Sequence, residues 1–148
     1  MPGTRTTGHF TAADWKEHPL TPADEIPRVA RASVTNSFTG GIEASGTVCE
    51  YVIVYVPGAT GPSTGPSTGT FIGTFTGMEL LTGRLDGREG TFAVEERGSF
   101  DADGTVHCAF EVVAGSGTGE LTGVRGTGEF TARHGEASVA YAFTYELG

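Results

Sequence analysis

Three glutamates lie on strand-like segments among apolar neighbours, where a carboxyl group is able to do acid–base chemistry. The first, Glu96, has the strand parity of Phe92 and Val94, and alternate residues of a strand face the same side. We therefore expect Glu96 to point into an apolar interior. Desolvation raises the pKa of a buried carboxylic acid, and such an acid can donate a proton near neutral pH. The alternative is a structural glutamate paired with Arg97 or Arg125.

Glu79 is the second candidate acid. It shares its parity with Phe75 and Leu81, and Gly73 and Gly77 occupy the same face. Small residues beside a carboxyl group leave room for a ligand, so a catalytic role is one interpretation. The other is a structural glutamate that satisfies hydrogen bonds at one end of a barrel.

The third candidate, Glu50, lies in the expected strand of residues 42–56, within the part Val48–Val56 that is apolar on both faces. The two faces carry, respectively, Val48, Glu50, Val52 and Val54, and Cys49, Tyr51, Ile53 and Tyr55. Periodicity does not decide which face points inward. If the first face does, Glu50 joins Glu96 and Glu79 in the catalytic set. If the second does, Tyr51 and Tyr55 donate hydrogen bonds to a carbonyl or enolate oxygen.

Aromatic side chains are the candidates for contact with a bound molecule. The predicted set is Trp15, Tyr51, Tyr55, Phe75, Phe92, Phe110, Tyr141 and Tyr145. Aromatic stripes of this kind also form ordinary cores, because large rings bury much apolar area. Tyr141 and Tyr145, which flank Phe143 on one face, are open to that second interpretation.

The sequence gives little support for a metal site or a nucleotide-binding site. No two histidines have the spacing of metal ligands, and we predict neither a metal nor a cofactor. His107 has the parity of Thr105 and Glu111 and is expected to face outward. The glycine-rich run 115–130 is followed by no lysine and no helical pattern, so it is not a phosphate loop. Interleaved Leu121 and Val124 instead predict a tight corner between two barrel strands.

Composition narrows the possible partners. The 148 residues carry a formal net charge of −9 and include 24 glycines. A negative chain is poorly suited to nucleic acid or to an anionic membrane surface. Cys49 and Cys108 lie in apolar runs and are expected to be buried free thiols. The N-terminus has no apolar signal core and no stretch is long enough to span a membrane, so we predict a soluble cytoplasmic protein.

Regularly spaced strand patterns without a helix predict an all-β fold. The expected strands are residues 8–17, 29–38, 42–56, 71–84, 91–100, 105–113, 129–133 and 138–147. About eight such segments suggest an eight-stranded antiparallel up-and-down barrel. It forms a single domain, residues 1–148, and the repeated Gly-Pro-Ser-Thr of residues 57–69 predicts a flexible loop. Asp86-Gly87 is a strong hairpin signal.

Several segments in the same order resemble one known family. They are Trp15-Lys-Glu17, Arg31-Ala-Ser-Val-Thr35, Phe38-Thr-Gly-Gly-Ile-Glu43, Phe75-Thr-Gly-Met-Glu79, Gly87-Arg-Glu-Gly-Thr-Phe92 and Val112-Val-Ala-Gly-Ser-Gly-Thr-Gly-Glu-Leu121. The chain resembles a bacterial family of small uncharacterised proteins with an allene oxide cyclase-like barrel. The resemblance implies that the eight-stranded barrel has a central cavity, and it implies relatives that close rings on reactive intermediates without a cofactor. The chain departs from the family pattern in its long Pro-Ser-Thr loop and in Glu96, where a histidine is expected.

Three functions are compatible with these observations. The first is a cofactor-independent cyclase or isomerase that acts on a small apolar molecule, polyketide-like or fatty-acid-like, in natural-product biosynthesis. The second is a protein that binds a small ligand without turnover, and the third is a structural protein with a filled barrel. The doubly apolar segment Val48–Val56 also predicts a homo-oligomer, a dimer or trimer, because an outward apolar face needs cover.

Overall fold

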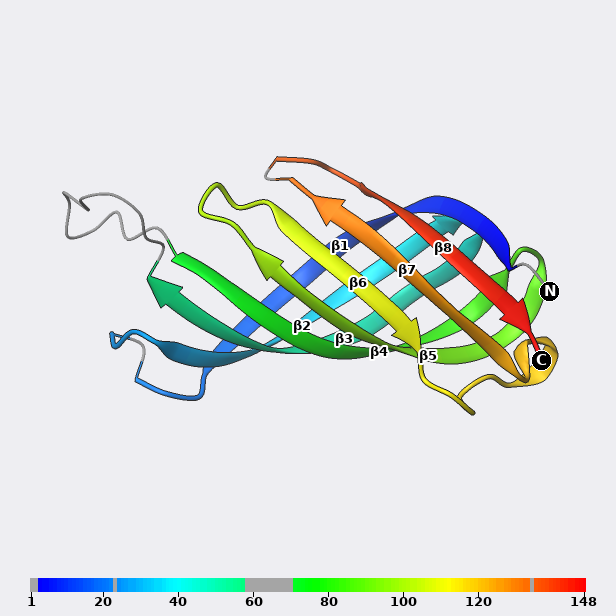
Figure 1. Ribbon diagram of the computed structural model, residues 1–148, viewed down its shortest axis with the longest axis horizontal. Helices are drawn as coiled ribbons and strands as arrows, with labels where there is room; N and C mark the ends of the chain where they lie inside the picture. Colours follow the sequence, from blue (N-terminus) through cyan, green and yellow to red (C-terminus); the bar gives the residue numbers. More distant parts are fainter. Residues whose placement is uncertain (1–2, 23, 58–70, 134) are drawn as a thin grey trace.

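The computed structural model describes residues 3–22, 24–57, 71–133 and 135–148, and they form one closed antiparallel β-barrel (Figure 1). Each strand pairs with the next one in the chain, and the last pairs with the first. The strands are β1 (Thr4–Pro19), β2 (Arg28–Gly40), β3 (Ile42–Pro57), β4 (Phe71–Leu85), β5 (Arg88–Phe100), β6 (Val106–Val112), β7 (Val124–Ala132) and β8 (Val139–Leu147). The predicted eight-stranded up-and-down barrel is confirmed.

The glycine-rich run divides into a corner and a strand. Its first half contains a short 3₁₀ turn, η1 (Gly119–Leu121), and the second half is already β7. Leu121 and Val124 are both buried, so the predicted corner also closes this end of the barrel. We expected β7 to begin only at Glu129. It begins five residues earlier because pairing with β8 outweighs the low strand preference of Gly126 and Gly128.

The β4–β5 hairpin follows directly from its two turn residues. Asp86 and Gly87 have positive φ angles of 47° and 87°, which is the backbone that a two-residue type I′ turn requires. The side chain of Asp86 also accepts a hydrogen bond from the Tyr145 hydroxyl at 2.6 Å. The turn therefore ties the β4–β5 hairpin to β8, near the two chain termini (Figure 1).

The two ends of the barrel differ in packing. The end that holds the termini is filled by a core in which the Phe92 and Phe143 rings stack with centroids 6.0 Å apart. Ile42, Leu85 and Leu121 complete this core, and each is almost completely buried. The other end, toward the β5–β6 and β7–β8 connections, holds a cavity. Large side chains thus seal one end and leave the other for a ligand.

Residues 58–70, which make up almost all of the predicted Pro-Ser-Thr loop, lie outside the described residues. Within the described part of the chain, no helix is long and apolar enough to cross a membrane.

Candidate functional site

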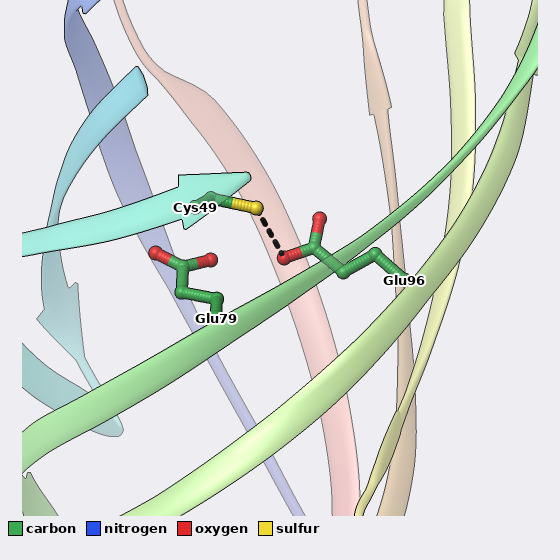
Figure 2. Close-up of side chains that lie close together, drawn as sticks. All are labelled: Cys49, Glu79 and Glu96. Carbon is green, nitrogen blue, oxygen red and sulfur yellow. Dashed lines mark hydrogen bonds between the residues drawn. The ribbon is translucent and has the colours of Figure 1, made fainter. Parts of the chain in front are cut away.

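Strand register brings the candidate acids together inside the barrel. Cys49 of β3 lies opposite Glu79 of β4, and Glu96 of β5 lies opposite Gly77. Glu79 and Glu96 are each only 3% exposed. Figure 2 shows the three side chains of Cys49, Glu79 and Glu96 turned toward one another from adjacent strands. Two of the three predicted acids are therefore neighbours in the interior.

Glu96 is held by three donors from its neighbours. The Tyr51 hydroxyl donates to Oε1 at 2.9 Å, and the Cys108 thiol donates to the same oxygen at 3.7 Å. The Cys49 thiol donates to Oε2 at 3.4 Å. These contacts fix the carboxyl group of Glu96 on the axis of the barrel. The alternative interpretation paired Glu96 with an arginine. Arg97 instead forms an ion pair with Glu95 on the outside of the barrel, and hydroxyl and thiol donors contact Glu96 in its place.

Glu79 is held from the opposite side by β2 and β3. The Asn36 side-chain amide donates to Oε2 at 3.0 Å, and the Thr47 hydroxyl donates to the same oxygen. A carboxylate oxygen of Glu96 lies within 4.8 Å of one of Glu79. The two acids therefore form one carboxyl pair inside a shell of polar side chains from β2, β3 and β6.

This environment keeps Glu79 protonated. Burial raises the pKa of Glu79 to about 8, the contact with Glu96 adds to the rise, and Thr47 and Asn36 oppose it. Among the described residues, no lysine, arginine or histidine is buried beside the pair to neutralise a second charge. The nearby charge of Glu96 therefore adds to the effect of burial, and Glu79 keeps its proton at neutral pH.

Burial also raises the pKa of the groups that donate to Glu96. The pKa values of the Cys49 and Cys108 thiols and of the Tyr51 hydroxyl lie well above their ordinary values, first because of desolvation and then because of the Glu96 charge. All three therefore remain protonated donors. The two cysteines are free and buried, as predicted.

The carboxyl pair and Cys49 are also the residues most able to bind a metal. Their donor atoms lie within 4.8 Å of one another. A metal would need the thiolate form of cysteine, however, and the raised pKa of Cys49 opposes that form.

An apolar cavity of about 440 Å³ lies toward the end of the barrel away from the termini, where Gly104, Val106 and Val139 border it. Its walls include Trp15, Val34, Asn36, Tyr51, Ile53, Tyr55, Phe75, Phe100, Phe130 and Val139. A second, smaller space of about 20 Å³, which we call the neck, is bordered by Glu79 and Glu96, and Asn36 and Tyr51 border both spaces. A space of that volume has room for a water molecule or a polar group of similar size.

Six of the eight predicted ligand-binding aromatics border these spaces. Trp15, Tyr51, Tyr55 and Phe75 line the cavity, and Phe110 and Tyr141 line the neck. Phe92 and Tyr145 do not, because both belong to the packed end of the barrel. These two aromatic residues are part of the packed core, as the alternative interpretation expected. Our prediction that they contact a ligand is corrected.

Glu50 is the second correction. Its side chain lies on the outer face of β3, where it is 56% exposed and 3.9 Å from the Arg31 guanidinium. Because Cys49 is the cross-strand partner of the buried Glu79, Cys49 and Tyr51 must face inward and Glu50 outward. Glu50 is therefore separated from the carboxyl pair by the sheet itself.

The glycines of β4 make room for aromatic rings rather than directly for a ligand. A side-chain carbon at Gly77 would lie 2.5 Å from the Tyr51 ring, and one at Gly73 would lie 2.6 Å from the Phe100 ring. Each ring crosses the space above a glycine on the neighbouring strand. The glycines thus position Tyr51 and Phe100 as walls of the cavity.

The sequence reasoning missed the polar shell around the pair. Asn36 and Thr47 were not singled out, although Asn36 has the parity of the buried residues Ala32 and Val34. A polar side chain on an apolar strand face was the signal that could have identified Asn36. Thr47 follows a bulge in β3 near Gly46, where the simple alternation is broken and parity gives no guidance.

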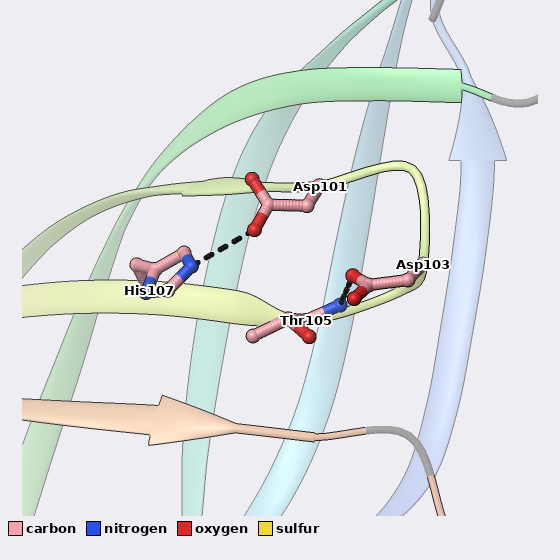
Figure 3. A network of polar contacts seen from close by, with 4 residues as sticks. All are labelled: Asp101, Asp103, Thr105 and His107. Carbon is pink, nitrogen blue, oxygen red and sulfur yellow. Dashed lines mark hydrogen bonds and ion pairs between the residues drawn. The ribbon is translucent and has the colours of Figure 1, made fainter.

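The β5–β6 turn forms part of the cavity rim through Gly104. In this turn the Asp103 carboxylate accepts a hydrogen bond from the Thr105 backbone N–H at 3.0 Å, and the His107 ring contacts Asp101 at 3.0 Å (Figure 3). His107 lies on the exposed face of β6, as predicted. The network stabilises the rim of the cavity.

Comparison with known proteins agrees with this fold. A model of a protein family of unknown function, DUF3224, matches residues 6–145. The chain belongs to the DUF3224 family. A crystal structure of a DUF3224 protein of unknown function from Shewanella oneidensis MR-1 is similar over 99% of this chain and 98% of that chain, with 27% sequence identity and a TM-score of 0.67. Membership of a family of uncharacterised proteins is thus confirmed.

No curated protein matches the chain. The allene oxide cyclase-like character of this DUF3224 barrel stays a prediction.

Proposed function

We propose that this DUF3224 protein is a cofactor-independent isomerase or cyclase that moves a proton on a small apolar molecule held in the barrel. The observation that carries the proposal is the position of the carboxyl pair. Glu79 and Glu96 lie at the inner end of an apolar cavity and share its neck with Tyr51. Acid–base residues with a pKa near the working pH are typical of active sites.

The pair is suited to bifunctional proton transfer. The Glu79 carboxyl group gives its proton to a carbonyl oxygen of the substrate, and the ionised carboxylate of the pair removes a proton from the neighbouring carbon. The substrate becomes an enol, and the number of protons on the pair is unchanged. Return of a proton to another carbon completes an isomerisation. Attack of the enol carbon on an electrophilic carbon of the same molecule completes a ring closure.

The cavity walls supply the remaining catalytic effect. Aromatic rings from β1, β3, β4 and β5 surround a volume of about 440 Å³, which is within the usual range for a small-molecule site. A flexible substrate confined there adopts fewer conformations, and correct orientation of the reacting atoms lowers the barrier by several kcal/mol. The resemblance to allene oxide cyclases supports a polyketide-like or fatty-acid-like substrate of this kind.

A protein that binds a small ligand without turnover is the second candidate. It is favoured by the completeness of the hydrogen bonds around Glu96, which are also what a purely structural pair would show. The two candidates agree on the cavity and differ on whether the pair exchanges protons with the ligand.

Deuterium exchange distinguishes them. The protein is incubated in heavy water with 2-tetralone, an enolisable ketone with an apolar body, and incorporation at the carbons beside the carbonyl is followed by NMR. We expect the wild type to accelerate exchange and Glu96→Gln to lower the protein-dependent rate about 100-fold, which is the usual contribution of a general acid or base. Glu50→Gln is the matched control, because it removes an outward carboxylate from the same barrel.

Equal rates for wild type and Glu96→Gln would reject the catalytic proposal. If the wild type binds 2-tetralone with no acceleration of exchange, the binding candidate replaces it.

A further inference from the structure

One polar atom at the inner end of the cavity has an open hydrogen-bonding position. The Asn36 side chain is 3% exposed, and its Nδ2 donates to Glu79. Its carbonyl oxygen Oδ1 accepts no hydrogen bond from the residues that the structure describes. Asn36 borders both the cavity and the neck. A buried acceptor without a donor is costly, so this position calls for a donor group from a bound molecule.

The other polar atoms around the neck are already engaged. Both oxygens of Glu96 accept from Tyr51, Cys49 or Cys108, and Oε2 of Glu79 accepts from Asn36 and Thr47. The hydroxyl and thiol donors are used in the same contacts. Oε1 of Glu79 accepts no hydrogen bond from the hydroxyl, thiol and amide groups of the described side chains, so we assign to it the proton of the neutral acid. The neck then offers a ligand one open acceptor, Asn36 Oδ1, and this one donor.

The open hydrogen-bonding positions of the neck limit the charge and the type of polar group that a ligand can place there. An ammonium group would bring three N–H donors to one open acceptor and leave two of them without partners. A carboxylate would place a negative charge beside an acidic pair with no buried cation among the described residues. An ether or ketone oxygen alone would leave Asn36 Oδ1 unsatisfied. A hydroxyl group has the single donor that the site lacks, and its oxygen has the size that the neck admits.

We propose that the cavity selects neutral apolar molecules that place a hydroxyl or enol group in the neck, where its O–H donates to Asn36 Oδ1. This inference specifies the substrate class of the proposed function and rests on the same cavity. In a keto–enol reaction, Asn36 would favour the enol form over the ketone, since only the enol has an O–H to donate. Asn36 is thus a specificity-determining residue beside the carboxyl pair.

The test compares ligands that share one aromatic body and differ in the polar group. Binding of 2-naphthol, naphthalene, 2-methoxynaphthalene, 2-naphthoate and 2-naphthylmethylamine is measured by titration calorimetry at neutral pH. We expect 2-naphthol to bind about tenfold more tightly than naphthalene or the methoxy compound, as one recovered hydrogen bond predicts. The two charged compounds are expected to bind more weakly than naphthalene. Equal binding of 2-naphthol and naphthalene, or tightest binding of the amine, would overturn the proposal.

Two variants on β2 link the selectivity to its residue. Asn36→Leu removes the acceptor at similar volume, and we expect it to abolish the preference for 2-naphthol while naphthalene still binds. Val34→Ala, the control, enlarges the same wall of the cavity and should weaken both ligands equally, so that their ratio is unchanged. A preference that persists in Asn36→Leu would contradict the inference. If Asn36→Leu does not fold, the wild-type ligand series still decides.

The ratio of the binding constants and the rate of deuterium exchange test the two proposals independently. A tenfold hydroxyl preference with no protein-dependent exchange would support the inference and reject the proposed catalysis. Protein-dependent exchange without any preference for the hydroxyl compound would support the proposed catalysis and reject the inference about Asn36.

Discussion

The Tyr51 hydroxyl donates a hydrogen bond of 2.9 Å to Glu96, while the ring of Tyr51 forms part of the cavity wall. One side chain therefore contacts both the space for a ligand and the acid that is proposed to react with it. The ring is fixed by edge-on packing against Phe75 at 5.2 Å and by the adjacent surface of Gly77. The position of the carboxyl pair relative to a ligand thus depends on Tyr51.

Tyr51→Phe tests this connection, because it retains the ring and removes the O–H. The variant leaves Glu96 Oε1 without its shortest hydrogen bond, so the Glu96 carboxylate is less well held and less well stabilised. Hydrogen bonds to charged groups contribute about 1.5–3 kcal/mol, so we expect the rate of 2-tetralone exchange to fall about tenfold or more. Naphthalene affinity, measured by calorimetry, should stay within about twofold of wild type. An unchanged exchange rate would show that Tyr51 acts only as a wall.

Stability should depend on pH through Glu79. Its pKa rises from 4.5 in the unfolded chain to about 8 in the barrel. Between pH 4.5 and about pH 8, the folded protein therefore binds a proton that the unfolded chain has lost. Folding stability is therefore greatest at the acidic side of this window and is lost as pH rises through about 8, by at most about 1.4 kcal/mol per pH unit. Urea unfolding at several pH values measures this slope.

Glu79→Gln removes the titrating group and should flatten the slope. Above pH 8 the variant is expected to be more stable than the wild type, since it carries no charge to bury. Glu50→Gln provides the control and should leave the slope as it is. A wild type whose stability rises from about pH 5 to about pH 8 would contradict the raised pKa of Glu79.

The strands and their order were predictable because alternation of apolar and polar residues is a local property. The inward face of β3 was not predictable in this way, because both of its faces are apolar. What decides it is non-local: pairing of Cys49 with Glu79 puts both on the same side. The inward face of β4 identifies the inward face of β3 only if the register between the two strands is known. A bulge between Ala44 and Cys49 shifts that register, so the sequence alone does not give it.

The carboxyl pair itself was predictable in part. Glu79 and Glu96 are each recognisable as acids on an apolar strand face, and the register of the β4–β5 hairpin, which the Asp86-Gly87 turn fixes, makes them diagonal neighbours. The role of Asn36 depends on one unsatisfied atom, which only the three-dimensional arrangement reveals. Phe92 and Tyr145 could not be separated from the cavity aromatics by sequence, because position along the barrel axis decides whether a ring packs or lines a space.

Gly77 is predicted to be intolerant of a side chain. A side-chain carbon there would lie 2.5 Å from the Tyr51 ring and 2.6 Å from the Glu50 carbonyl oxygen. We expect Gly77→Ala to lower the free energy of unfolding by about 1–3 kcal/mol, as overpacking usually does, and to displace Tyr51 from Glu96. Thr76→Ala, on the exposed face of β4, should change stability far less. Chemical denaturation of both variants tests this, and equal stability would contradict the packing argument.

The two thiols should be inert in the folded protein. Cys49 and Cys108 are buried, and their pKa values are raised by desolvation and by the Glu96 charge. Because the thiolate is the reactive form, iodoacetamide at about pH 8 should label neither cysteine until the protein is unfolded. Mass spectrometry before and after denaturant counts the labels. Rapid labelling of the native protein would show that the interior around Glu96 is open to water.

An exposed apolar surface on β3 and β4 predicts self-association. Its exposed side chains are Val48, Val52, Met78 and Leu80. It is bordered by the ion pairs Arg31–Glu50 and Arg97–Glu95, so a second copy related by a two-fold axis is able to place acidic groups against basic ones. We propose that a copy of this chain covers the surface. Met78→Lys should then shift the protein toward monomer in sedimentation velocity.

Leu147→Lys, which changes an exposed apolar residue on β8, is the control and should leave the assembly intact. Sedimentation of the wild type as monomer at micromolar concentration would reject the proposed interface.

The pH dependence of 2-tetralone exchange tests the central claim most directly. A carboxyl pair that works as acid and base must keep the proton of Glu79, so the wild-type rate should fall as pH rises through about 8, the pKa of this group. Glu79→Gln should lose this decline together with most of the rate, and Glu50→Gln should retain both. A rate that is independent of pH across this range, or equal in wild type and Glu79→Gln, would show that the pair takes no part in proton transfer.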